Sequence, residues 1–279
     1  MNKNFIYINT NKTLSLSTTG TNCFLNCIHC QKFYLKHMQS IEIFGNNNIE
    51  NEKLINKLLN NYTSFLISGG LNENFEIPIY KYEKEIKFLK ENNKLLNFHI
   101  GFLKEKNFFI LNYADAISID IIGSSIAIKN IYGIDKKPTD YINLLDQILK
   151  YKGDNKLNFK IVPHITIGLD YGKDSGEKEV IQILKNYKNI DKIVFNILKK
   201  TESVNFDFDI NLNYIKEILI CARENLKEKI LFIGCMRPSG IKRKEIDNFS
   251  FHIGFDGIVN PSFKYKEYFK LFNNCCSLF

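Results

Sequence analysis

The chain has 279 residues, of which 44% are hydrophobic and 24% charged, with a formal net charge of +8. This length fits one large α/β domain or two ordinary ones, and the composition supports a folded core without disulfide bonds, which excludes a disordered chain. The lysines are spread through amphipathic stretches such as residues 80–94 and 180–192, which indicates solvated helix faces rather than a nucleic-acid-binding patch.

Short apolar runs alternate with helical stretches rich in Lys and Glu, a pattern typical of βα units around a parallel sheet. The expected strands are residues 14–18, 64–68, 96–100, 116–121, 159–167, 192–197, 230–234 and 254–258. The helices expected after them are residues 50–61, 79–92, 104–112, 139–150, 178–187, 212–227, 243–249 and 262–271. These units predict a TIM-type (β/α)8 barrel, complete or nearly complete.

No linker rich in Pro, Gly or Ser divides the chain. We therefore expect a single domain over residues 1–279, with residues 262–279 as a C-terminal helix and tail. Active sites of such barrels lie at the C-terminal ends of the strands. Polar residues that directly follow each expected strand are the candidates for function.

The loop after the first expected strand carries three cysteines, Cys23, Cys27 and Cys30, in a CxxxCxxC pattern. Three thiolates can bind three irons of a [4Fe–4S] cluster and leave the fourth iron open to a substrate. A structural zinc site with His29 as a fourth ligand is the alternative. Zinc commonly takes two separated cysteine pairs, however, and no second CxxC occurs in the chain.

At these cysteines the sequence resembles the radical S-adenosylmethionine (SAM) superfamily, in particular its biotin-synthase-like branch. That branch includes archaeal biotin synthase homologues and the two-component archaeal lipoyl synthases. The resemblance also rests on residues 68–70, 164–169, 234–238 and 275–278. It implies that the cluster cleaves SAM reductively to a 5′-deoxyadenosyl radical, which then removes hydrogen from a substrate.

The resemblance also implies a SAM-binding role for residues at the first two strand ends. His29 stands where the family often has an aromatic residue. Ser68, Gly69 and Gly70 follow the second strand, where glycine allows a ligand to approach the backbone closely. The family often continues with Glu, but this chain has Leu71, so the contact to SAM would come mainly from the backbone.

Further candidates for cofactor binding follow the fourth and fifth strands: Ser118, Asp120, His164, Thr166 and Gly168. By resemblance, the first two would face the ribose or the substrate. Thr166 and Gly168 would lie near the adenine and methionine parts of SAM. His164 has an alternative role as a hydrogen-bonded core histidine, as does His99 at the end of the third strand.

A second group of cysteines suggests an auxiliary Fe–S cluster. Cys235 follows the seventh strand, and Cys275 and Cys276 lie in the tail, with Ser277 as a candidate oxygen ligand. If the tail folds back across the barrel mouth, these residues could hold a second cluster. In the alternative interpretation, the adjacent cysteines only pack or react adventitiously. A helix ending at residue 271 would finish at the opposite face of the barrel, which counts against the second cluster.

The cellular context follows from what the sequence lacks. No basic region precedes a long apolar run at the start, and no segment reaches the ~18 apolar residues of a membrane span. We expect a cytoplasmic protein with no membrane partner, and its seven cysteines favour metal ligands or core thiols over disulfides, because the cytosol keeps thiols reduced.

These features lead to one expected activity and two alternatives. We expect sulfur insertion during cofactor biosynthesis, on a small-molecule or carrier-protein-bound substrate, with a ferredoxin- or flavodoxin-like electron donor. The chain lacks the CxxxxCxxxxxC auxiliary motif of bacterial lipoyl synthases. The alternatives are a maturase that rearranges or cleaves a small metallocofactor precursor, and a non-catalytic Fe–S electron carrier.

Overall fold

A single curled sheet of parallel strands organises the computed structural model, which describes residues 5–45, 49–202, 208–262 and 269–279. The strands of these ranges are β1 (Ile6–Ile8), β2 (Thr13–Ser17), β3 (Gln39–Ser40), β4 (Ser64–Ser68), β5 (Leu95–His99), β6 (Ala116–Asp120), β7 (Lys160–Ile167), β8 (Lys192–Ile197), β9 (Ile230–Ile233), β10 (Gly257–Val259) and β11 (Lys270–Phe272). They pair in the order β11-β1-β10-β9-β8-β7-β6-β5-β4-β2-β3. The chain forms a single α/β domain, as the sequence predicts.

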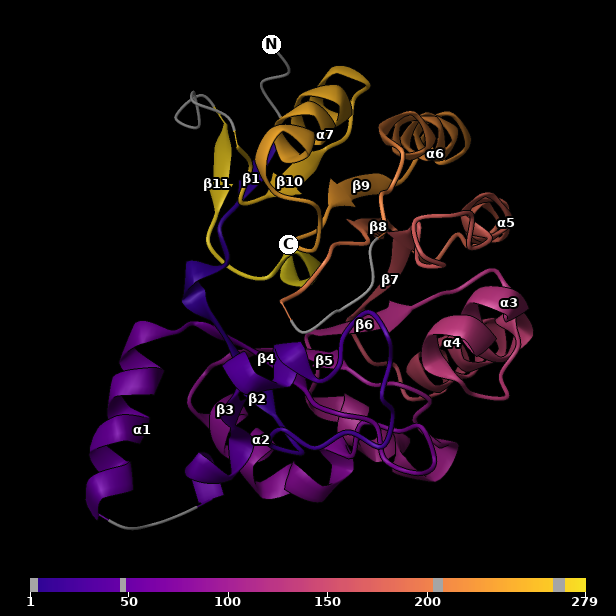
Figure 1. The fold of residues 1–279 in the computed structure, drawn as a ribbon. Helices are drawn as coiled ribbons and strands as arrows, with labels where there is room; N and C mark the ends of the chain where they lie inside the picture. The colour runs from indigo at the N-terminus through magenta and orange to yellow at the C-terminus, as the bar shows by residue number, and fades with distance from the viewer. Residues whose placement is uncertain (1–4, 46–48, 203–207, 263–268) are drawn as a thin grey trace.

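The predicted barrel strands are all present, as β2 and β4 to β10. In a closed eight-stranded barrel β10 would pair with β2, but here β1 and then β11 follow β10, and β3 extends the other edge beyond β2. Within the described ranges the two edge strands do not pair with each other. The sheet is therefore an open, curled form of the predicted barrel, and Figure 1 shows it bending around the C-terminus.

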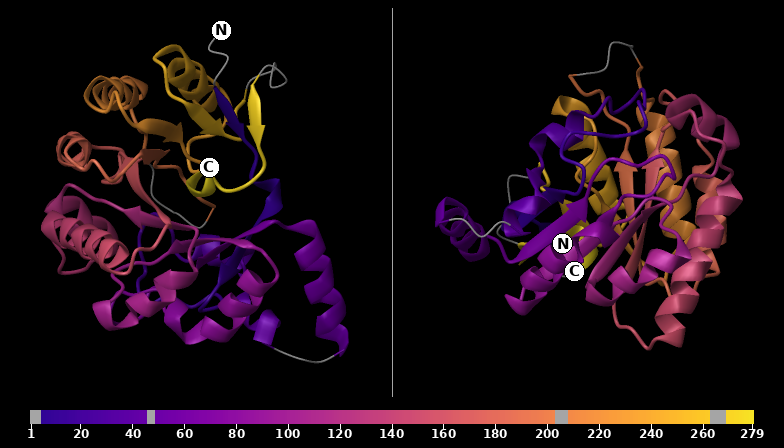
Figure 2. Two further views of the ribbon diagram at one scale, coloured as in Figure 1. Left: turned by 180° about the vertical axis from the view of Figure 1, so that it is seen from behind. Right: turned by 90° about the horizontal axis from the view of Figure 1, so that it is seen from below.

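Helices cover the outer face of the sheet, as Figures 1 and 2 show. They are α1 (Ile49–Asn61), α2 (Glu83–Glu91), α3 (Ser125–Ala127), α4 (Pro138–Asp154), α5 (Glu177–Lys185), α6 (Leu212–Asn225) and α7 (Gly240–His252). In α5, Val180, Ile181 and Leu184 recur at helical spacing and are buried, so this face packs on the sheet. The helix expected at residues 104–112 is a 3-10 helix, η5 (Glu105–Tyr113).

Alternation along the strands separates an apolar outer side from a polar interior. Leu96 and Phe98 of β5 are fully buried in the core. The alternate residues Asn97 and His99 are polar. Asn97 contacts the tail, and His99 contacts Asp120 on the neighbouring strand β6. The interior of the sheet therefore carries polar groups suited to binding a ligand.

The end of the chain corrects the predicted C-terminal helix. Most of that helix, residues 263–268, lies outside the described residues, but Lys270–Phe272 forms β11 rather than a helical end. β11 pairs in parallel with β1, through bonds such as Asn9 N to Phe272 O at 2.8 Å. The free edge of β1 offers backbone groups that a strand satisfies and a helix does not.

The final residues enter the interior of the sheet from its N-terminal end. Cys276–Leu278 forms a short 3-10 helix, η8. Lys160 and Lys192, at the first positions of β7 and β8, donate to main-chain oxygens of this tail, including that of Phe279. The tail therefore does not cross the barrel mouth, as the second-cluster hypothesis required. The mouth, with the cysteine loop after β2, lies at the C-terminal ends of the strands, and the tail enters at their N-terminal ends.

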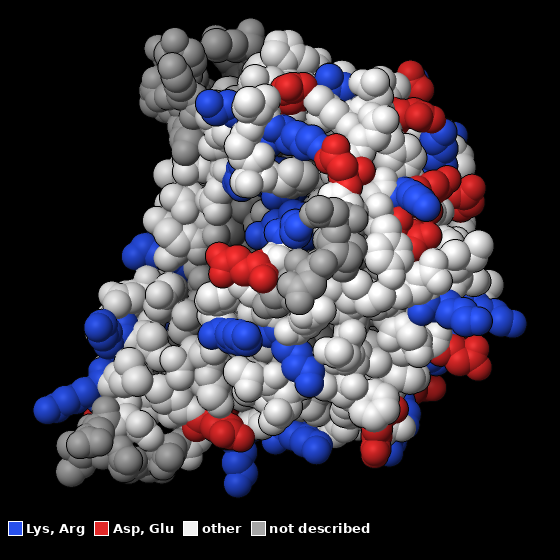
Figure 3. Space-filling view, in the orientation of Figure 1, with Lys and Arg blue, Asp and Glu red and all other residues white. Residues whose placement is uncertain are grey.

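Charged side chains show no single dominant patch on the face drawn in Figure 3. Lysines and arginines occur across this face with acidic side chains between them, as expected for solvated helix faces. Among the described helices, none combines the length and apolar character that crossing a membrane requires.

Candidate cofactor site

The three cysteines of the CxxxCxxC motif lie on one tightly turned loop after β2. Cys30 N and Gln31 N both donate to Cys27 O, at 3.0 and 2.9 Å, and Phe33 N donates to Cys30 O at 2.8 Å. Each cysteine is half-buried and forms no disulfide. The loop therefore presents three free thiols at the C-terminal end of a barrel strand.

Gly70 locks this loop against the end of β4. A Cβ atom on Gly70 would lie 2.0 Å from Asn22 O and 2.6 Å from Cys23 Cα, so no larger residue fits without displacing the loop. Leu71 N donates to Cys23 Sγ at 3.3 Å, and Gly70 N donates to Thr19 Oγ1 at 2.7 Å. The sequence analysis expected a ligand close to the backbone at Gly70. In the structure, the cysteine loop occupies that position.

Gly69 is fixed by a similar contact. A Cβ atom there would lie 2.6 Å from Thr18 Oγ1. Thr18 Oγ1 is itself one of the buried side-chain atoms of the described residues that have no hydrogen-bond partner, as is His29 Nδ1. Buried polar atoms are usually hydrogen-bonded, so both atoms suit a site that receives a polar ligand.

The thiols of Cys27 and Cys30 favour their neutral form in this environment. Burial raises the pKa of Cys27 to about 12, helped by the nearby Cys30 and Cys23, and burial also raises the pKa of Cys30. A bound cation reverses this preference, because metal binding replaces the thiol protons. The sulfur donor set therefore fits a thiophilic metal centre.

No three His, Cys, Asp or Glu side chains within the described ranges stand close enough together to hold a single metal ion. This holds for the CxxxCxxC loop and for the second cysteine group alike. A four-iron cluster is larger than one ion, and its three cysteines bind three different irons. The loop sulfurs therefore need not meet at one point to hold such a cluster.

A histidine–aspartate pair lies at the ends of β5 and β6. His99 Nε2 is 3.0 Å from Asp120 Oδ2, and Ser68 Oγ lies 3.5 Å from His99 Nδ1. The side chains of His99 and Asp120 remain 34% and 41% exposed, although both point into the curled sheet. A solvent-accessible space therefore lies inside the sheet at this level.

Each member of this pair stabilises the charged form of the other. Burial lowers the pKa of His99, but the carboxylate of Asp120 outweighs it and leaves the pKa raised. For Asp120, burial raises the pKa, and His99 with the more distant His164 and His29 outweighs it, so the pKa is lowered. His99 is thus hydrogen-bonded, as its alternative interpretation required, and it also remains accessible.

His164 is the register partner of Asp120 on the next strand, β7. Its Nδ1 lies 3.1 Å from Val162 O. A carbonyl can only accept, so Nδ1 carries the proton. Burial lowers the pKa of His164 to about 4, and a neutral ring therefore keeps a lone pair on Nε2.

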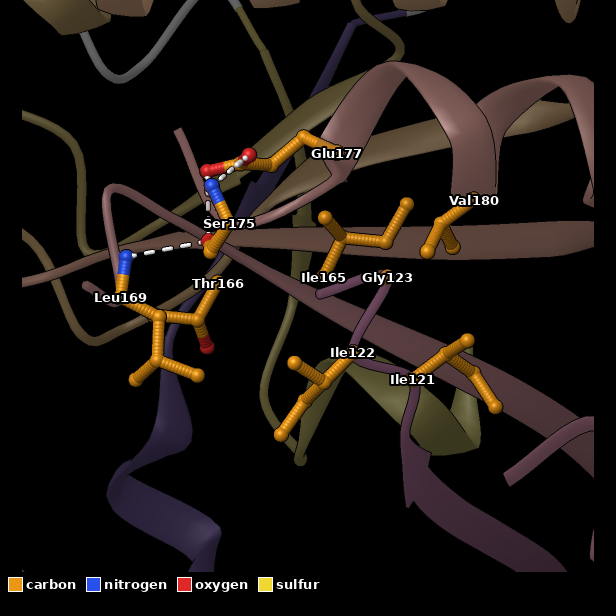
Figure 4. A pocket seen from close by; sticks show the side chains of 9 residues that line it. All are labelled: Ile121, Ile122, Gly123, Ile165, Thr166, Leu169, Ser175, Glu177 and Val180. Atoms are coloured by element: carbon orange, nitrogen blue, oxygen red, sulfur yellow. Dashed lines mark hydrogen bonds between the residues drawn. The ribbon is translucent and has the colours of Figure 1, made fainter. Parts of the chain in front are cut away.

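The loop after β7 is held by a buried carboxylate that the sequence analysis missed. Glu177, at the start of α5, is 2% exposed and accepts from Gly168 N at 2.6 Å and Ser175 N at 2.7 Å. Figure 4 shows Glu177 with Ser175 beside a small gap that Thr166 also lines. The glycine-rich stretch 168–176 before an acidic helix start was the available sequence signal.

Gly168 has a conformation that favours glycine. Its φ is +73°, and a Cβ atom would lie 2.3 Å from Ile210 Cδ1. With its N–H bonded to Glu177, the turn after β7 is fixed beside Thr166. The structure thus places Gly168 on a fixed turn and Thr166 beside it, near the end of β7.

The tail residues of the second cysteine group lie in the interior nearer to the N-terminal ends of the strands than His99 and Asp120. Asn97 Nδ2 donates to Cys275 Sγ at 3.3 Å. Ser118 Oγ donates to Asn97 Oδ1 at 3.0 Å and lies 2.9 Å from Ser277 Oγ. Ser118, predicted to face the ribose or substrate, thus contacts the tail.

Cys235, Cys275 and Cys276 influence one another electrostatically without converging as metal ligands. A hydrogen bond with Cys276 lowers the pKa of Cys275 to about 6, whereas that bond raises the pKa of Cys276. Cys235, after β9, is exposed to solvent inside the curled sheet. The protein atoms that surround its thiol still reduce the hydration of the thiolate, which raises the pKa of Cys235. The tail enters the interior from the N-terminal ends of the strands, not across the barrel mouth.

Comparison with known proteins gives structural neighbours only. No protein-family model matches the chain, and no curated protein is similar to it in sequence. The FeFe-hydrogenase maturase HydG from Carboxydothermus hydrogenoformans matches 92% of this chain with a TM-score of 0.63 and 16% identity. The chain spans only 59% of the length of that protein.

Two other neighbours cover more of their own length. Methylornithine synthase (PylB) matches 94% of this chain and 74% of its own, with a TM-score of 0.60 and 10% identity. The HMG-CoA lyase from Brucella melitensis matches 92% and 80%, with a TM-score of 0.54 and 10% identity. At such identities the matches establish a common fold, and one fold hosts many chemistries.

Proposed function

We propose that the chain is a radical SAM enzyme whose Cys23, Cys27 and Cys30 hold a [4Fe–4S] cluster. The observation that carries the proposal is the CxxxCxxC loop, held by Gly70 at the C-terminal end of a curled parallel sheet. When bound, the cluster supplies the electron that cleaves SAM and so starts carbon-radical chemistry. The protein residues bind, orient and shield the reactants.

The residues around the loop would perform distinct tasks. Leu71 N, which already donates to Cys23 Sγ, would stabilise a thiolate at that position. His29 Nδ1 and Thr18 Oγ1 would gain partners from a polar ligand. Ser68, Gly69, Gly70, Asp120, His164, Thr166 and Gly168 remain the candidates for binding SAM or substrate.

The space inside the sheet would receive the substrate. Asp120 uses one carboxylate oxygen for His99, which leaves the other available, and neutral His164 provides a second acceptor. Toward the N-terminal ends of the strands, the tail fills the interior, where Ser277 is hydrogen-bonded to Ser118. A small molecule or the end of a carrier-bound chain fits such a space, which would keep water from a reactive radical.

For the reaction itself, two candidates are supported by different observations. Cys275 brings a thiol into the interior of the sheet, where Asn97 Nδ2 donates to its sulfur at 3.3 Å, and this placement supports sulfur insertion in cofactor biosynthesis. The similarity in fold to HydG, a hydrogenase maturase, supports the maturation of a metallocofactor at least as well. Assays with an octanoylated carrier protein or peptide separate the two: thiolated product favours insertion, and 5′-deoxyadenosine without it favours the maturase.

Anaerobic reconstitution tests the cofactor assignment. We expect about four irons per chain, and an electron paramagnetic resonance spectrum of the reduced protein that changes when SAM is added. Replacing any of Cys23, Cys27 or Cys30 with Ala should abolish both results, whereas Cys221→Ala on α6 should change neither. Zinc at the loop without iron would contradict the assignment, and a spectrum insensitive to SAM would favour an electron carrier.

A further inference from the structure

The thiol of Cys275 is held inside the curled sheet by buried hydrogen-bond donors. Asn97, whose Nδ2 donates to Cys275 Sγ at 3.3 Å, is only 1% exposed. Ser118 Oγ donates to Asn97 Oδ1 at 3.0 Å, and this bond turns the N–H groups of the amide toward the sulfur. Cys275 itself is only half-buried. Its sulfur is therefore accessible, while the group that holds it is not.

The tail around this thiol is fixed on both sides. Cys275 N donates to Thr13 Oγ1 at 2.7 Å, and Lys192 Nζ donates to Cys276 O at 3.1 Å. The Cys276 thiol and the Ser277 N–H also donate to the sulfur of Cys275. Several donors to one sulfur favour the thiolate, which is the nucleophilic form of cysteine.

Cys275 lies close to the space that would receive the substrate. Its partner Asn97 and the histidine His99 point to the same face of β5, and two residues span about 7 Å of a strand. Burial lowers the pKa of His99 and Asp120 raises it, and the charge of Cys275 adds to the rise. A second sulfur atom bonded to Cys275 would lengthen its side chain by about 2 Å.

The surroundings of this sulfur suit a nucleophile better than a metal ligand. Within the described ranges, no three metal-ligating side chains gather around one point, the tail included. Cys275 and Cys276 are both free thiols, and one donates to the other instead of forming a disulfide. The thiolate of Cys275 is therefore available for reaction with an electrophilic sulfur atom.

We propose that Cys275 accepts a sulfur atom as a persulfide and delivers it to the substrate, which rests on the sulfur-insertion form of the proposed function. The thiolate attacks the outer sulfur of a persulfide or polysulfide, a new S–S bond forms, and the donor leaves as a thiolate or shorter polysulfide. The substrate carbon radical then bonds to the outer sulfur, and the S–S bond breaks homolytically. The Cys275 thiyl radical takes one electron from the reductant that also reduces the cluster, and the substrate sulfur takes a proton from water.

Loading with polysulfide tests the first step without SAM. The reconstituted holoenzyme is treated anaerobically, desalted, alkylated and digested with trypsin, and fragment ions locate extra sulfur in the peptide that follows Lys270. We expect about ten times more at Cys275 than at Cys221, because the thiolate reacts. Cys221 is the matched control, since it is also half-buried and accepts from Asn225 Nδ2 at 3.7 Å. Asn97→Ala should slow loading about tenfold through the lost hydrogen bond.

Equal loading of Cys275 and Cys221 in the wild-type protein, or none at Cys275, would overturn the proposal, and this comparison holds even if Asn97→Ala fails to fold.

Delivery is tested with a heavy sulfur isotope. Protein loaded with the isotope and freed of donor receives SAM, dithionite and an octanoylated peptide. We expect the isotope in a thiolated product, and Cys275→Ser should form none. A product without the isotope, or 5′-deoxyadenosine without thiolated product, would overturn delivery by Cys275. If the wild type forms no 5′-deoxyadenosine, the proposed function fails instead, whereas the loading result does not depend on it.

Discussion

At the residue scale, the site depends on one glycine that sequence analysis assigned to the cofactor. From its place after a strand, Gly70 was predicted to contact SAM. The structure shows that the absence of a side chain at Gly70 makes room for Cys23. The sequence indicates that Gly70 follows a strand, but it does not indicate that Gly70 contacts Cys23. That contact depends on how the loops after β2 and β4 fold together. Glu177 was missed for a similar reason, since only the folded turn shows its carboxylate bonded to Gly168 and Ser175.

Gly70→Ala should displace the cysteine loop. The added methyl group would overlap Asn22 O and Cys23 Cα, and overpacking of this kind costs about 1–3 kcal/mol. Iron bound after reconstitution should fall well below the wild-type value, with at least a tenfold loss of SAM cleavage. Gly153→Ala in α4 is the control, because nothing lies within 4 Å of its Cβ position. Equal iron contents in the two variants would show that the loop tolerates the displacement.

Asp120→Asn should lower the pKa of His99, measured from the chemical shift of its ring proton during an NMR titration. The carboxylate holds the pKa of His99 above its usual value, and His99 holds the pKa of Asp120 below its own. The stability contributed by His99 is present at low pH and is lost as pH rises through its raised pKa. The contribution of Asp120 is lost as pH falls through its lowered pKa. An unchanged or raised His99 pKa in the variant would contradict the pairing.

At the scale of elements, apolar runs were sufficient to locate the barrel strands. β1, β3 and β11, with three, two and three residues, are too short to show a two-residue alternation. Residues 262–271 have a helical pattern, yet their last residues form a strand because β1 provides a pairing partner. Tertiary pairing of this kind overrides local propensity, so a single sequence does not reveal it.

Lys192→Met should loosen the tail. Lys192 is 4% exposed, and its Nζ donates to the main-chain oxygens of Cys276 and Phe279. Without the ammonium group, buried oxygens lose a donor, which costs about 1–3 kcal/mol in the free energy of unfolding. Urea denaturation should show this loss, whereas Lys188→Met, at an exposed turn, should stay within ~0.5 kcal/mol of the wild type. Equal midpoints would mean that the tail contributes little to stability.

At the scale of the whole molecule, the two ends of the curled sheet differ in chemistry. The end after the strands carries the cysteine loop and the His99–Asp120 pair, and the other end is closed by the tail. At the first end the candidate residues could be selected from the sequence, because polar residues directly follow several of the expected strands. The sequence could not predict the second end, because the tail reaches Asn97 and Ser118 from more than a hundred residues away.

The second cysteine group can be tested without the first. In a variant with Cys23, Cys27 and Cys30 all replaced by Ala, about four irons per chain after reconstitution would support a cluster at Cys235, Cys275 and Cys276. A chain free of iron would remove the auxiliary cluster. Since these cysteines do not converge in the described structure, binding would require the tail to shift, and an altered protease sensitivity near residue 275 should accompany it.

The most direct test of radical SAM chemistry is the product of SAM cleavage. The reconstituted protein is reduced with dithionite under anaerobic conditions, SAM is added, and 5′-deoxyadenosine is quantified by mass spectrometry against a Cys27→Ala control. We predict that the wild-type protein forms 5′-deoxyadenosine and that the control forms none. A wild-type protein that holds a reduced four-iron cluster and binds SAM, yet yields no 5′-deoxyadenosine, would contradict the proposed function.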